Sequence, residues 1–478
     1  MKIAFVASEA APFVKTGGLG DVASALPSAL AAAGQDVSVI LPLYRQIKTG
    51  PLFSSMEQVA VFDTRLAWRT LYTGVFALSP KPGGTRYYFI DNEYYFCRPG
   101  NGIYGEYDDG ERFAFFALAA LGLIEKLGLD PDVIHCNDWQ TAALPVFLRT
   151  HFRGRLRAGT LFTIHNIEYQ GRMPLSFAAD VLGLGGEDAR LVEFDGCVNL
   201  MKGAIECSDY VSTVSETYAR EILYPYYANG LHRVIASRAA AGRLCGIVNG
   251  IDTELYDPSA DPALDANYTA DDPLGKRVCR DALRRELGLF RDDGIPLCGM
   301  VTRLASHKGI DLVERVLFEM ADAGVQFAIL GTGESRFEDF FRCAAAARPG
   351  MISATIGFSG RLASRIYAGS DLFLMPSKSE PCGLSQLVAM RYGAVPVVRE
   401  TGGLADTVPA YDPASEEGSG FTFKSYNAHD MKDAVLRAAG LFRDPGDAFS
   451  RLRRKDMLTD FSWKAATGKY INLYEKIR

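Results

Sequence analysis

A lysine and three glycines stand close together near the start of the chain, in the stretch "KTGGLG" over residues 15–20. Lys15 supplies a positive charge, and Gly17, Gly18 and Gly20 let a ligand approach the backbone closely. The Ala- and Leu-rich run that follows predicts a helix, whose first N–H groups attract anions. This combination favours an anion site, with a plain turn between a strand and a helix as the alternative. The spacing matches neither G-x-G-x-x-G nor G-x-x-x-x-G-K-[ST], so it identifies no common nucleotide loop.

Further polar residues come directly after apolar runs of strand length. Because ligands of open α/β sheets bind beyond the carboxyl ends of the strands, we treat these residues as candidates for a site. They are Asp138 after "VIHCN", His165 after "LFTI", Asn249 in "IVNGID", Arg303 and Lys308 after "MVT", Glu380, Cys382, Gly383 and Leu384 after "FLMPS", and Thr401, Gly402 and Gly403 after "PVVRE". Taken singly, each has an ordinary explanation, such as a hydrogen-bonded structural histidine or a solvated loop cation. The stretch "TGGL" recurs after two different strands, which indicates two similar helix starts.

The elements that must position these residues alternate between strands and helices. Strands are expected at "KIAFVAS", "QDVSVILP", "TRYYFIDN", "PDVIHCND", "GTLFTIHN" and "DYVSTVS", and later at "PLCGMVTRL", "QFAILGTG", "ISATIGF", "DLFLMPS" and "AVPVVRE". Helical runs lie between them, such as "DVASALPSALAAAG", which Gly34 should end. A stretch rich in Asp, Pro, Ala and Gly at 244–275 interrupts the alternation. The pattern predicts an α/β protein with two doubly wound, Rossmann-like domains at 1–245 and 246–458, facing a deep cleft, and a C-terminal helix within 459–478 that packs back on the first domain.

Composition excludes several classes of protein. The net charge of −6 over 478 residues offers no basic field for nucleic acid, and no apolar run is long enough to span a membrane. The nine cysteines are scattered, without a C-x-x-C pair, which fits reduced thiols in the cytoplasm better than disulfides or a zinc site. The oligomeric state has no signal in the sequence.

Several longer motifs, taken in order, resemble those of one family. They are "KTGGLGDV" at 15–22, "HCNDWQT" at 135–141, "FTIHNIEYQG" at 162–171, "VNGIDTELYDP" at 248–258, "TRLASHKGIDL" at 302–312, "PSKSEPCGLSQLVAMRYG" at 376–393 and "RETGGLADTV" at 399–408. Over essentially its whole length the chain resembles the bacterial glycogen synthases and plant starch synthases, which are glycosyltransferases of the GT-B class. The resemblance implies transfer of glucose from ADP-glucose to the non-reducing end of an α-1,4-glucan or malto-oligosaccharide, with retention at the anomeric carbon.

The resemblance also implies roles for individual residues. Arg303 and Lys308 would hold the donor diphosphate, with Lys15 nearby, and Glu380 would contact the glucosyl unit. His165 would line the sugar site, and Phe358 would face the adenine. We expect neither a metal nor a cofactor, because cations and helix N-termini can stabilise the leaving ADP. Asp138 is a candidate nucleophile by its motif position, but we favour front-face attack assisted by the leaving phosphate.

Three positions depart from the family pattern. His307 replaces a common glutamine, Ser379 replaces a common aromatic residue, and Val388 stands where related enzymes place a ribose-binding glutamate. These departures affect the donor pocket rather than the chemistry. The alternatives are a UDP-glucose-dependent GT-B synthase and an inactive glucan-binding scaffold of the same fold. A phosphorylase-like reaction would need a pyridoxal-binding lysine, which the sequence does not reveal.

Overall fold

The chain forms two compact units in a computed structural model that describes residues 1–79, 84–100 and 102–478. Unit 1 comprises Met1–Gly250 and Trp463–Arg478, and unit 2 comprises Ile251–Ser462. The division falls after Gly250 and not after 245, because strand β12 (Leu244–Gly246) still pairs in parallel with β11 (Tyr210–Thr213) of unit 1. The C-terminal helix α18 (Trp463–Ile477) belongs to unit 1, while residues 459–462 belong to unit 2.

Among the described residues, unit 1 is built on a nine-stranded sheet in the order β12-β11-β7-β6-β1-β2-β5-β4-β3. The remaining strands are β1 (Lys2–Val6), β2 (Asp36–Pro42), β3 (Glu57–Leu66), β4 (Arg69–Leu78), β5 (Arg86–Asp91), β6 (Val133–Asn137) and β7 (Gly159–Ile164). All pair in parallel except β3 with β4 and β4 with β5. A small second sheet contains β8 (Arg172–Met173), β10 (Cys197–Asn199) and β9 (Glu193–Phe194).

The hairpin of β3 and β4 was not expected from the sequence. β3 is largely exposed, so it lacks the apolar run that marks a buried strand. Its turn at Ala67 and Trp68 contains no glycine or asparagine, although Ala67 has a φ of 51°. The six strands that the sequence did predict for this half are all present.

Helices pack on the sheet of unit 1 through apolar stripes. They are α1 (Gly18–Ala32), α2 (Arg45–Lys48), α3 (Glu93–Phe96), α4 (Asp109–Lys126), α5 (Ala143–Arg149), α6 (Phe177–Asp180), α7 (Leu200–Cys207), α8 (Glu216–Glu221), α9 (His232–Ala240), with the short 3₁₀ turns η1 (Pro51–Ser55), η2 (Trp139–Thr141) and η3 (Asp188–Leu191). In α1, Leu19, Val22, Leu26 and Leu30 recur at helical spacing and are buried. Gly34 ends this helix as predicted, with a φ of 85° that favours glycine.

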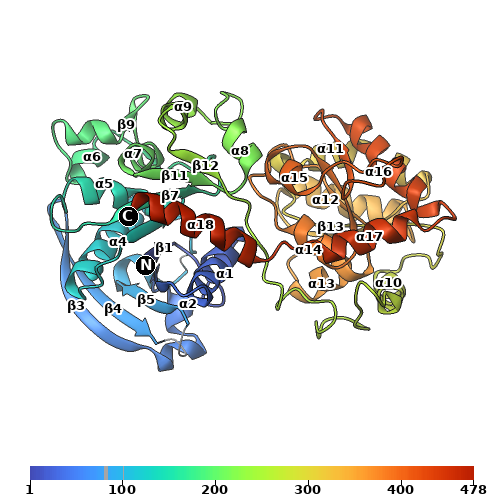
Figure 1. Cartoon of the computed structure of the whole chain (residues 1–478), viewed down its shortest axis with the longest axis horizontal. Helices are drawn as coiled ribbons and strands as arrows, with labels where there is room; N and C mark the ends of the chain where they lie inside the picture. Colours follow the sequence, from blue (N-terminus) through green and yellow to red (C-terminus); the bar gives the residue numbers. More distant parts are fainter. Residues whose placement is uncertain (80–83, 101) are drawn as a thin grey trace. The chain divides into compact units, whose positions relative to one another are not determined.

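The C-terminal helix completes unit 1. α18 lies beside α1 and β7, far from either in the sequence (Figure 1). The hydroxyl of Tyr474 on this helix lies 2.8 Å from Nδ1 of the buried His135 on β6. The helix therefore contributes a polar contact as well as apolar area to the core of unit 1.

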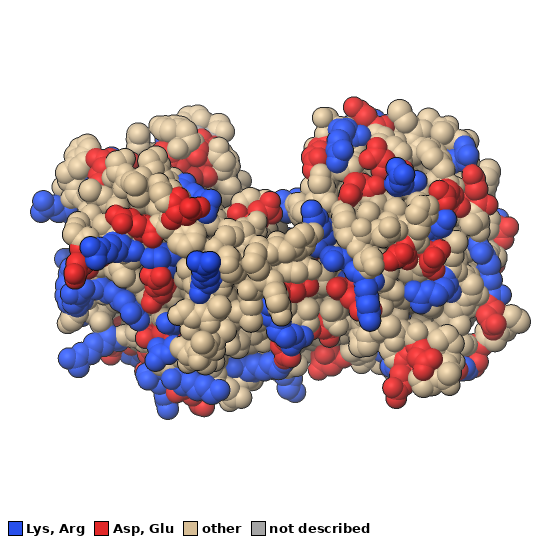
Figure 2. Space-filling model, turned by 90° about the horizontal axis from the view of Figure 1, so that it is seen from above, with Lys and Arg blue, Asp and Glu red and all other residues tan. Residues whose placement is uncertain are grey.

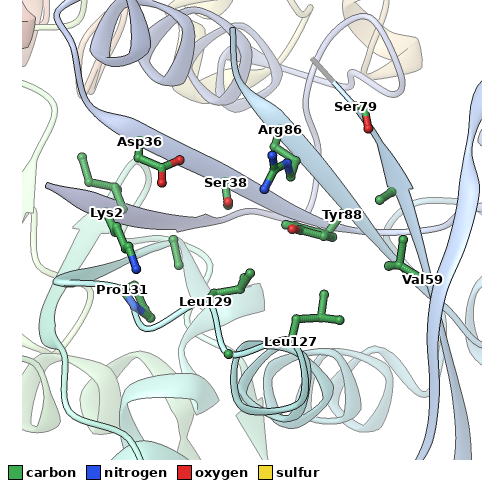
Figure 3. Close-up of a pocket in the computed structure, with 14 residues that line it drawn as sticks. Lys2, Asp36, Ser38, Val59, Ser79, Arg86, Tyr88, Leu127, Leu129 and Pro131 are labelled. Atoms are coloured by element: carbon green, nitrogen blue, oxygen red, sulfur yellow. The ribbon is translucent and has the colours of Figure 1, made fainter. Parts of the chain in front are cut away.

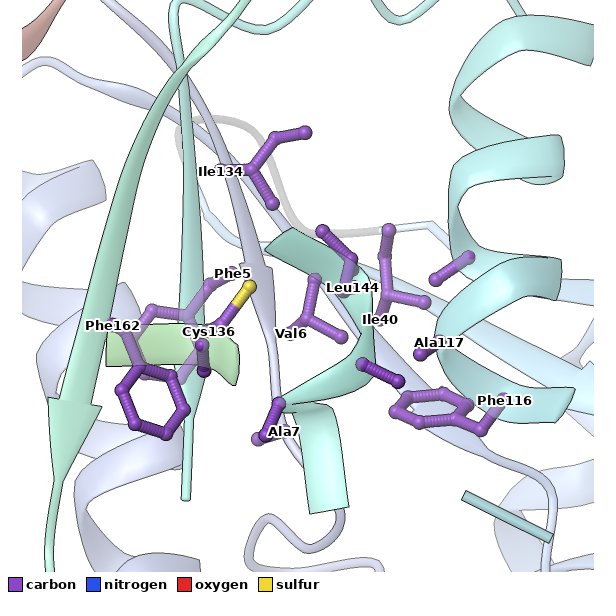
Figure 4. Close-up of a cluster of buried hydrophobic side chains, with 14 of the residues drawn as sticks. Phe5, Val6, Ala7, Ile40, Phe116, Ala117, Ile134, Cys136, Leu144 and Phe162 are labelled. Carbon is purple, nitrogen blue, oxygen red and sulfur yellow. The ribbon is translucent and has the colours of Figure 1, made fainter. Parts of the chain in front are cut away.

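The centre of that core lies where β1, β6 and β7 meet α4 and α5. Phe5 and Val6 of β1, Cys136 of β6 and Phe116 of α4 belong to the cluster drawn in Figure 4, and all four are fully buried. Because strands covered on both faces need apolar side chains on both, "KIAFV" is an almost continuous apolar run. The loops that follow β1, β6 and β7 carry Lys15, Asp138 and His165.

Among the described residues, unit 2 has a six-stranded parallel sheet in the order β15-β14-β13-β16-β17-β18. Its strands are β13 (Leu297–Val301), β14 (Gln326–Gly331), β15 (Ile352–Ile356), β16 (Leu372–Met375), β17 (Val395–Arg399) and β18 (Phe421–Phe423). Its helices are α10 (Leu274–Leu287), α11 (Ile310–Asp322), α12 (Ser335–Ala347), α13 (Gly360–Gly369), α14 (Ser385–Arg391), α15 (Gly402–Thr407), α16 (Ala428–Arg443) and α17 (Ala448–Leu458), with the 3₁₀ turn η4 (Ser306–Lys308). Numbered from β13, the strand order is 3-2-1-4-5-6, which defines a Rossmann-type domain. The sequence missed only β18 in this sheet.

The surface carries both signs of charge. On the face seen in Figure 2, lysine and arginine side chains are interspersed with aspartate and glutamate. That face offers no single-sign field of the kind that attracts nucleic acid. Among the residues that the structure describes, no helix is long and apolar enough to cross a membrane.

Candidate active site

In each sheet, some of the candidate residues lie at the point where the strand order reverses. In unit 2 the reversal lies between β13 and β16, so the loops after these strands, which carry Lys308 and Glu380, are neighbours. In unit 1 the reversal lies between β1 and β6, whose loops carry Lys15 and Asp138. Parallel sheets bind ligands at such switch points, because adjacent loops diverge there and leave a crevice.

In unit 2, Lys308 and Glu380 form an ion pair. Lys308 Nζ donates to Glu380 Oε2 at 2.7 Å, and the hydroxyl of Ser377 donates to the same oxygen at 2.9 Å. The side chain of Glu380 is 8% exposed and that of Lys308 is 19% exposed. A half-buried cation beside a buried carboxylate can serve both a phosphate and a sugar hydroxyl.

The loops that bear this pair are locked together by close backbone contact. Gly309 has a φ of 74°, and a Cβ at this position would lie 2.1 Å from the carbonyl oxygen of Pro376. The amide of Lys378 donates to the carbonyl of His307 at 2.9 Å. This packing requires glycine directly after Lys308, and it brings two loops that are 72 residues apart into register.

Arg303 lies on the exposed side of the same loop. Its guanidinium Nη2 lies 3.2 Å from Nε2 of His307. The departure at His307 therefore places a ring beside the arginine that the family resemblance assigns to the diphosphate. The exposed guanidinium has further N–H donors that can bind a phosphate.

The second "TGGL" stretch packs closely against the backbone of the loop that carries Glu380. A Cβ on Gly402 would lie 2.0 Å from the carbonyl oxygen of Glu380, and one on Gly403 would lie 2.0 Å from that of Cys382. The amide of Gly403 already donates to the carbonyl of Glu380 at 3.0 Å, and that of Thr401 donates to the carbonyl of Arg399. These glycines thus allow two backbone segments to touch, and these two amides bind protein oxygens in this structure.

The segment from Cys382 to Leu384 leads into α14, which begins at Ser385. Gly383 has a φ of 72°, and Leu384 caps the helix without a side-chain bond. Gln386 donates to the carbonyls of Cys382 and Gly383. The N-cap residue of α14 is therefore Leu384 and not Glu380.

Two other residues of the expected donor site, and one position that departs from the family pattern, have distinct surroundings. Phe358 follows β15 and is 91% exposed. Asn249 is 5% exposed, and its Oδ1 has no hydrogen-bond partner among the described residues. Val388 is buried in an apolar cluster, so it makes no polar contact where related enzymes place a glutamate.

In unit 1 the glycine stretch forms the start of α1, and Lys15 in this stretch forms an ion pair with a nearby residue of the helix. Lys15 is exposed, and its Nζ donates to Asp21 Oδ1 at 2.7 Å. Gly17 and Gly18 are exposed at the helix start, and a Cβ on Gly17 would meet no atom within 4 Å. Steric contacts therefore do not require a glycine at position 17.

Asp138 and His165 are joined by hydrogen bonds at the ends of β6 and β7. Asp138 Oδ1 accepts from the amides of His165 at 2.8 Å and Asn166 at 3.2 Å. Burial raises the pKa of Asp138 to about 7, although these two amides oppose the shift. Asp138 also has a φ of 56° with an extended ψ, a strained conformation that is typical of functional sites.

His165 is neutral, and its Nδ1 has no hydrogen-bond partner among the described residues. Its Nε2 lies 2.9 Å from Asn137 Oδ1, and because Asn137 Nδ2 donates to Val6, that oxygen is the acceptor and His165 Nε2 carries the proton. Burial lowers the pKa of His165 to about 3. Nδ1 is therefore an acceptor, suited to a hydroxyl group and not to a phosphate.

Two other features of unit 1, a group of residues that could bind a metal and a cavity, are not part of the candidate active site. Asp91, Glu93 and Cys97 could surround a metal, but Lys48 donates to Asp91 at 3.1 Å and so supplies a built-in cation. A cavity of about 500 Å³ opens among Lys2, Asp36, Arg86 and Tyr88 (Figure 3). It lies at the amino ends of β1, β2 and β5, the opposite end from the candidate residues, and thus is not the active site.

Comparison with known proteins agrees with this geometry. The family model for the starch synthase catalytic domain matches residues 2–237, and that for glycosyl transferases group 1 matches residues 282–439. The structure of a sucrose-phosphate synthase from Thermosynechococcus elongatus has the same fold, with a TM-score of 0.61 at 19% identity over 99% of this chain and 98% of that one. The fold and the two switch-point loops define a two-domain glycosyltransferase of the GT-B class.

Closer relatives define the family. Glycogen synthases of Geobacillus thermodenitrificans and Bacillus subtilis are 47% and 44% identical over 100% of this chain and 98% of each relative. The catalytic domain of starch synthase IV from Arabidopsis thaliana, bound to ADP and acarbose, has a TM-score of 0.90 at 33% identity, covering 99% of this chain and 98% of that one. The chain belongs to the family of glycogen and starch synthases.

Sequence reasoning missed several residues that the structure adds to the site. Glu9, Asn137, Asp21 and Ser377 each contact a predicted residue or its loop. Glu9 and Asn137 do lie at or just past a strand end, so a stricter use of that rule would have found them. Ser377 and Asp21 carried no separate signal, because short polar residues are common in loops.

Proposed function

We propose that the protein transfers the glucosyl unit of ADP-glucose to the non-reducing end of an α-1,4-glucan, with retention at the anomeric carbon. The observation that carries this proposal is the Lys308–Glu380 pair at the switch point of unit 2, with Arg303 on the same loop. The family membership and the ADP and acarbose bound to the related starch synthase IV support the choice of donor and acceptor.

In this proposal unit 2 holds the donor. Arg303 and Lys308 bind the diphosphate, and Glu380 binds the glucosyl unit as positive charge develops on its ring. Phe358 stacks on the adenine, which agrees with a ring that is 91% exposed. β15 lies two strands from β13, roughly 10 Å away, a distance that the diphosphate and ribose can bridge.

The candidate residues of unit 1 take the roles that the family resemblance implies. His165 Nδ1 and Asn249 Oδ1 accept from sugar hydroxyls, and Lys15 lies near the donor phosphates. The neutral state of His165 and the unpartnered Oδ1 of Asn249 support these roles. We propose that the reaction needs neither a metal nor a cofactor, and that it takes place in the cytoplasm, which the nine free thiols support.

The transfer step proceeds on one face of the sugar. The bond between C1 and the β-phosphate oxygen breaks, and its electron pair leaves with ADP. The acceptor 4-hydroxyl oxygen bonds to C1, and its proton passes to an oxygen of the leaving phosphate. Asp138 is disfavoured as a nucleophile, because a pKa of about 7 leaves much of it protonated and its Oδ1 is held by two amides.

Incubation with a malto-oligosaccharide and either ADP-glucose or UDP-glucose tests the function. We expect products longer by one or more glucosyl units with ADP-glucose, released ADP in equal amount, and much slower extension with UDP-glucose. Faster extension with UDP-glucose would instead identify a UDP-glucose synthase. Binding of the oligosaccharide without extension by either donor would identify an inactive scaffold.

A further inference from the structure

A buried carboxylate occupies the anion site that the glycine stretch predicts. Glu9 follows β1 and is 2% exposed. Its Oε2 accepts from the amide of Thr16 at 2.7 Å and from the hydroxyl of Thr16 at 2.6 Å. Its Oε1 accepts from the amide of Gly20 at 3.0 Å. The anion at the start of α1 is therefore part of the protein itself.

The same contacts fix the segment that carries Lys15. The amide of Ala11 donates to the carbonyl of Gly20 at 3.0 Å, which closes the loop across its base. A Cβ on Gly20 would lie 3.0 Å from Cγ of Lys15, so the lysine stem rests on this glycine. Asp21 then holds Nζ at 2.7 Å. Glu9 binds Thr16, directly after Lys15, and Gly20, on which the lysine stem rests.

Keeping a charge on Glu9 is unfavourable for the fold. Burial raises the pKa of Glu9, and the hydrogen bonds from Thr16 and Gly20 offset only part of this shift. Its charge also raises the pKa of Asp138 in the same unit. A buried carboxyl group whose charged form is disfavoured adds little to stability, so a function that depends on its hydrogen bonds is the better explanation.

We propose that Glu9 is a positioning residue for glucosyl transfer, because its carboxylate binds Thr16 and Gly20 and so fixes the backbone that presents Lys15. This inference rests on the proposed function, in which Lys15 lies near the donor phosphates. It also implies that the amides of Thr16 and Gly20 do not hold the donor phosphates, since Glu9 already binds them.

A double-mutant cycle tests whether Glu9 acts through Lys15. We expect Glu9→Gln to lower kcat/KM for ADP-glucose by about thirtyfold or more, with KM for the malto-oligosaccharide within about twofold of wild type. In a Lys15→Ala background the same change should cost less than about threefold, because the group it positions is gone. Glu57→Gln, on the exposed edge strand β3 of the same unit, is the matched control and should leave activity unchanged. Equal losses in both backgrounds would overturn the proposal.

Amide hydrogen exchange tests the positioning directly and without activity. In Glu9→Gln the amides of Thr16 and Gly20 should exchange at least about tenfold faster, while those of α4 keep their wild-type rates. Unchanged exchange at these two amides, or faster exchange throughout unit 1, would overturn the proposal. If Lys15→Ala alone leaves kcat/KM unchanged, the role of Lys15 in the proposed function fails, whereas the exchange result still decides whether Glu9 orders the loop.

Thr16→Val provides a second variant should Glu9→Gln fail to fold. It removes the hydroxyl that donates to Glu9 at 2.6 Å and keeps the amide that donates at 2.7 Å. We expect a loss in kcat/KM for ADP-glucose of about three- to tenfold and faster exchange at Gly20. Wild-type values of both quantities would contradict the role of Glu9.

Discussion

Lys308 Nζ lies 2.7 Å from Glu380 Oε2, although the two residues are 72 positions apart in the chain. Each side chain is largely withdrawn from solvent, so each charge compensates the other. In the proposed reaction Lys308 binds the diphosphate and Glu380 binds the glucosyl unit of one donor molecule. The two residues of the pair therefore bind the two groups that separate when the bond breaks.

We expect Lys308→Ala to weaken use of the donor far more than use of the acceptor. Loss of one charged contact to the leaving ADP should cost about 2–4 kcal/mol of transition-state stabilisation. Steady-state kinetics with ADP-glucose and a malto-oligosaccharide measure this. The matched control is Lys432→Ala, which breaks the surface pair with Glu319 at the same 2.7 Å distance in the same unit. An unchanged kcat/KM for ADP-glucose in Lys308→Ala would exclude the role.

Glu380→Gln should lower kcat by roughly a hundredfold or more while Tm and ADP affinity stay close to wild type. Glutamine can still accept from Lys308 and Ser377, so the local structure is kept and only the charge is lost. Glu319→Gln on the surface controls for the substitution itself. Retention of more than about a third of wild-type kcat would show that the carboxylate is structural.

Gly402→Ala and Gly403→Ala should each lower both activity and Tm. The new Cβ would lie 2.0 Å from a carbonyl oxygen of the Glu380–Cys382 segment, so that segment must shift. Gly468→Ala in α18 is the control, because its Cβ would meet no atom within 4 Å and alanine favours a helix by about 1 kcal/mol. Thermal melting and kcat measure the effect. Wild-type activity in Gly403→Ala would show that the Glu380 loop tolerates displacement.

Stability should depend on pH through Asp138. Its pKa is about 7 in the folded protein and near 3.8 when exposed, so between these values the folded state binds a proton that the unfolded state has lost. The contribution of the neutral carboxyl is full below about pH 4 and disappears as pH rises through 7. Between pH 5 and pH 8, Tm of the wild type should fall by a few degrees relative to Tm of Asp138→Asn. Parallel Tm profiles would show that Asp138 titrates normally.

The sequence alone determined the order of the strands along the chain and the residues at their ends. Apolar runs such as "KIAFV" and "QFAILG" are local patterns, and each forms a strand in the structure. The helix that Gly34 ends and the family motifs could likewise be identified from local sequence. The hairpin of β3 and β4 escaped because an exposed edge strand needs no apolar run.

Only the tertiary structure decided which of the residues at the strand ends contact one another and which of them are charged. The contact of Lys308 with Glu380 follows from the placement of β13 beside β16, which no local periodicity encodes. The amides of Thr16 and Gly20 bind Glu9 and that of Gly403 binds Glu380, so glycine stretches that resemble anion sites are partly filled by the protein. The pKa of Asp138 depends on burial by segments remote in sequence. Residue types and spacing specify which groups are available for chemistry, whereas strand order and desolvation, which depend on the whole chain, decide their partners and charges.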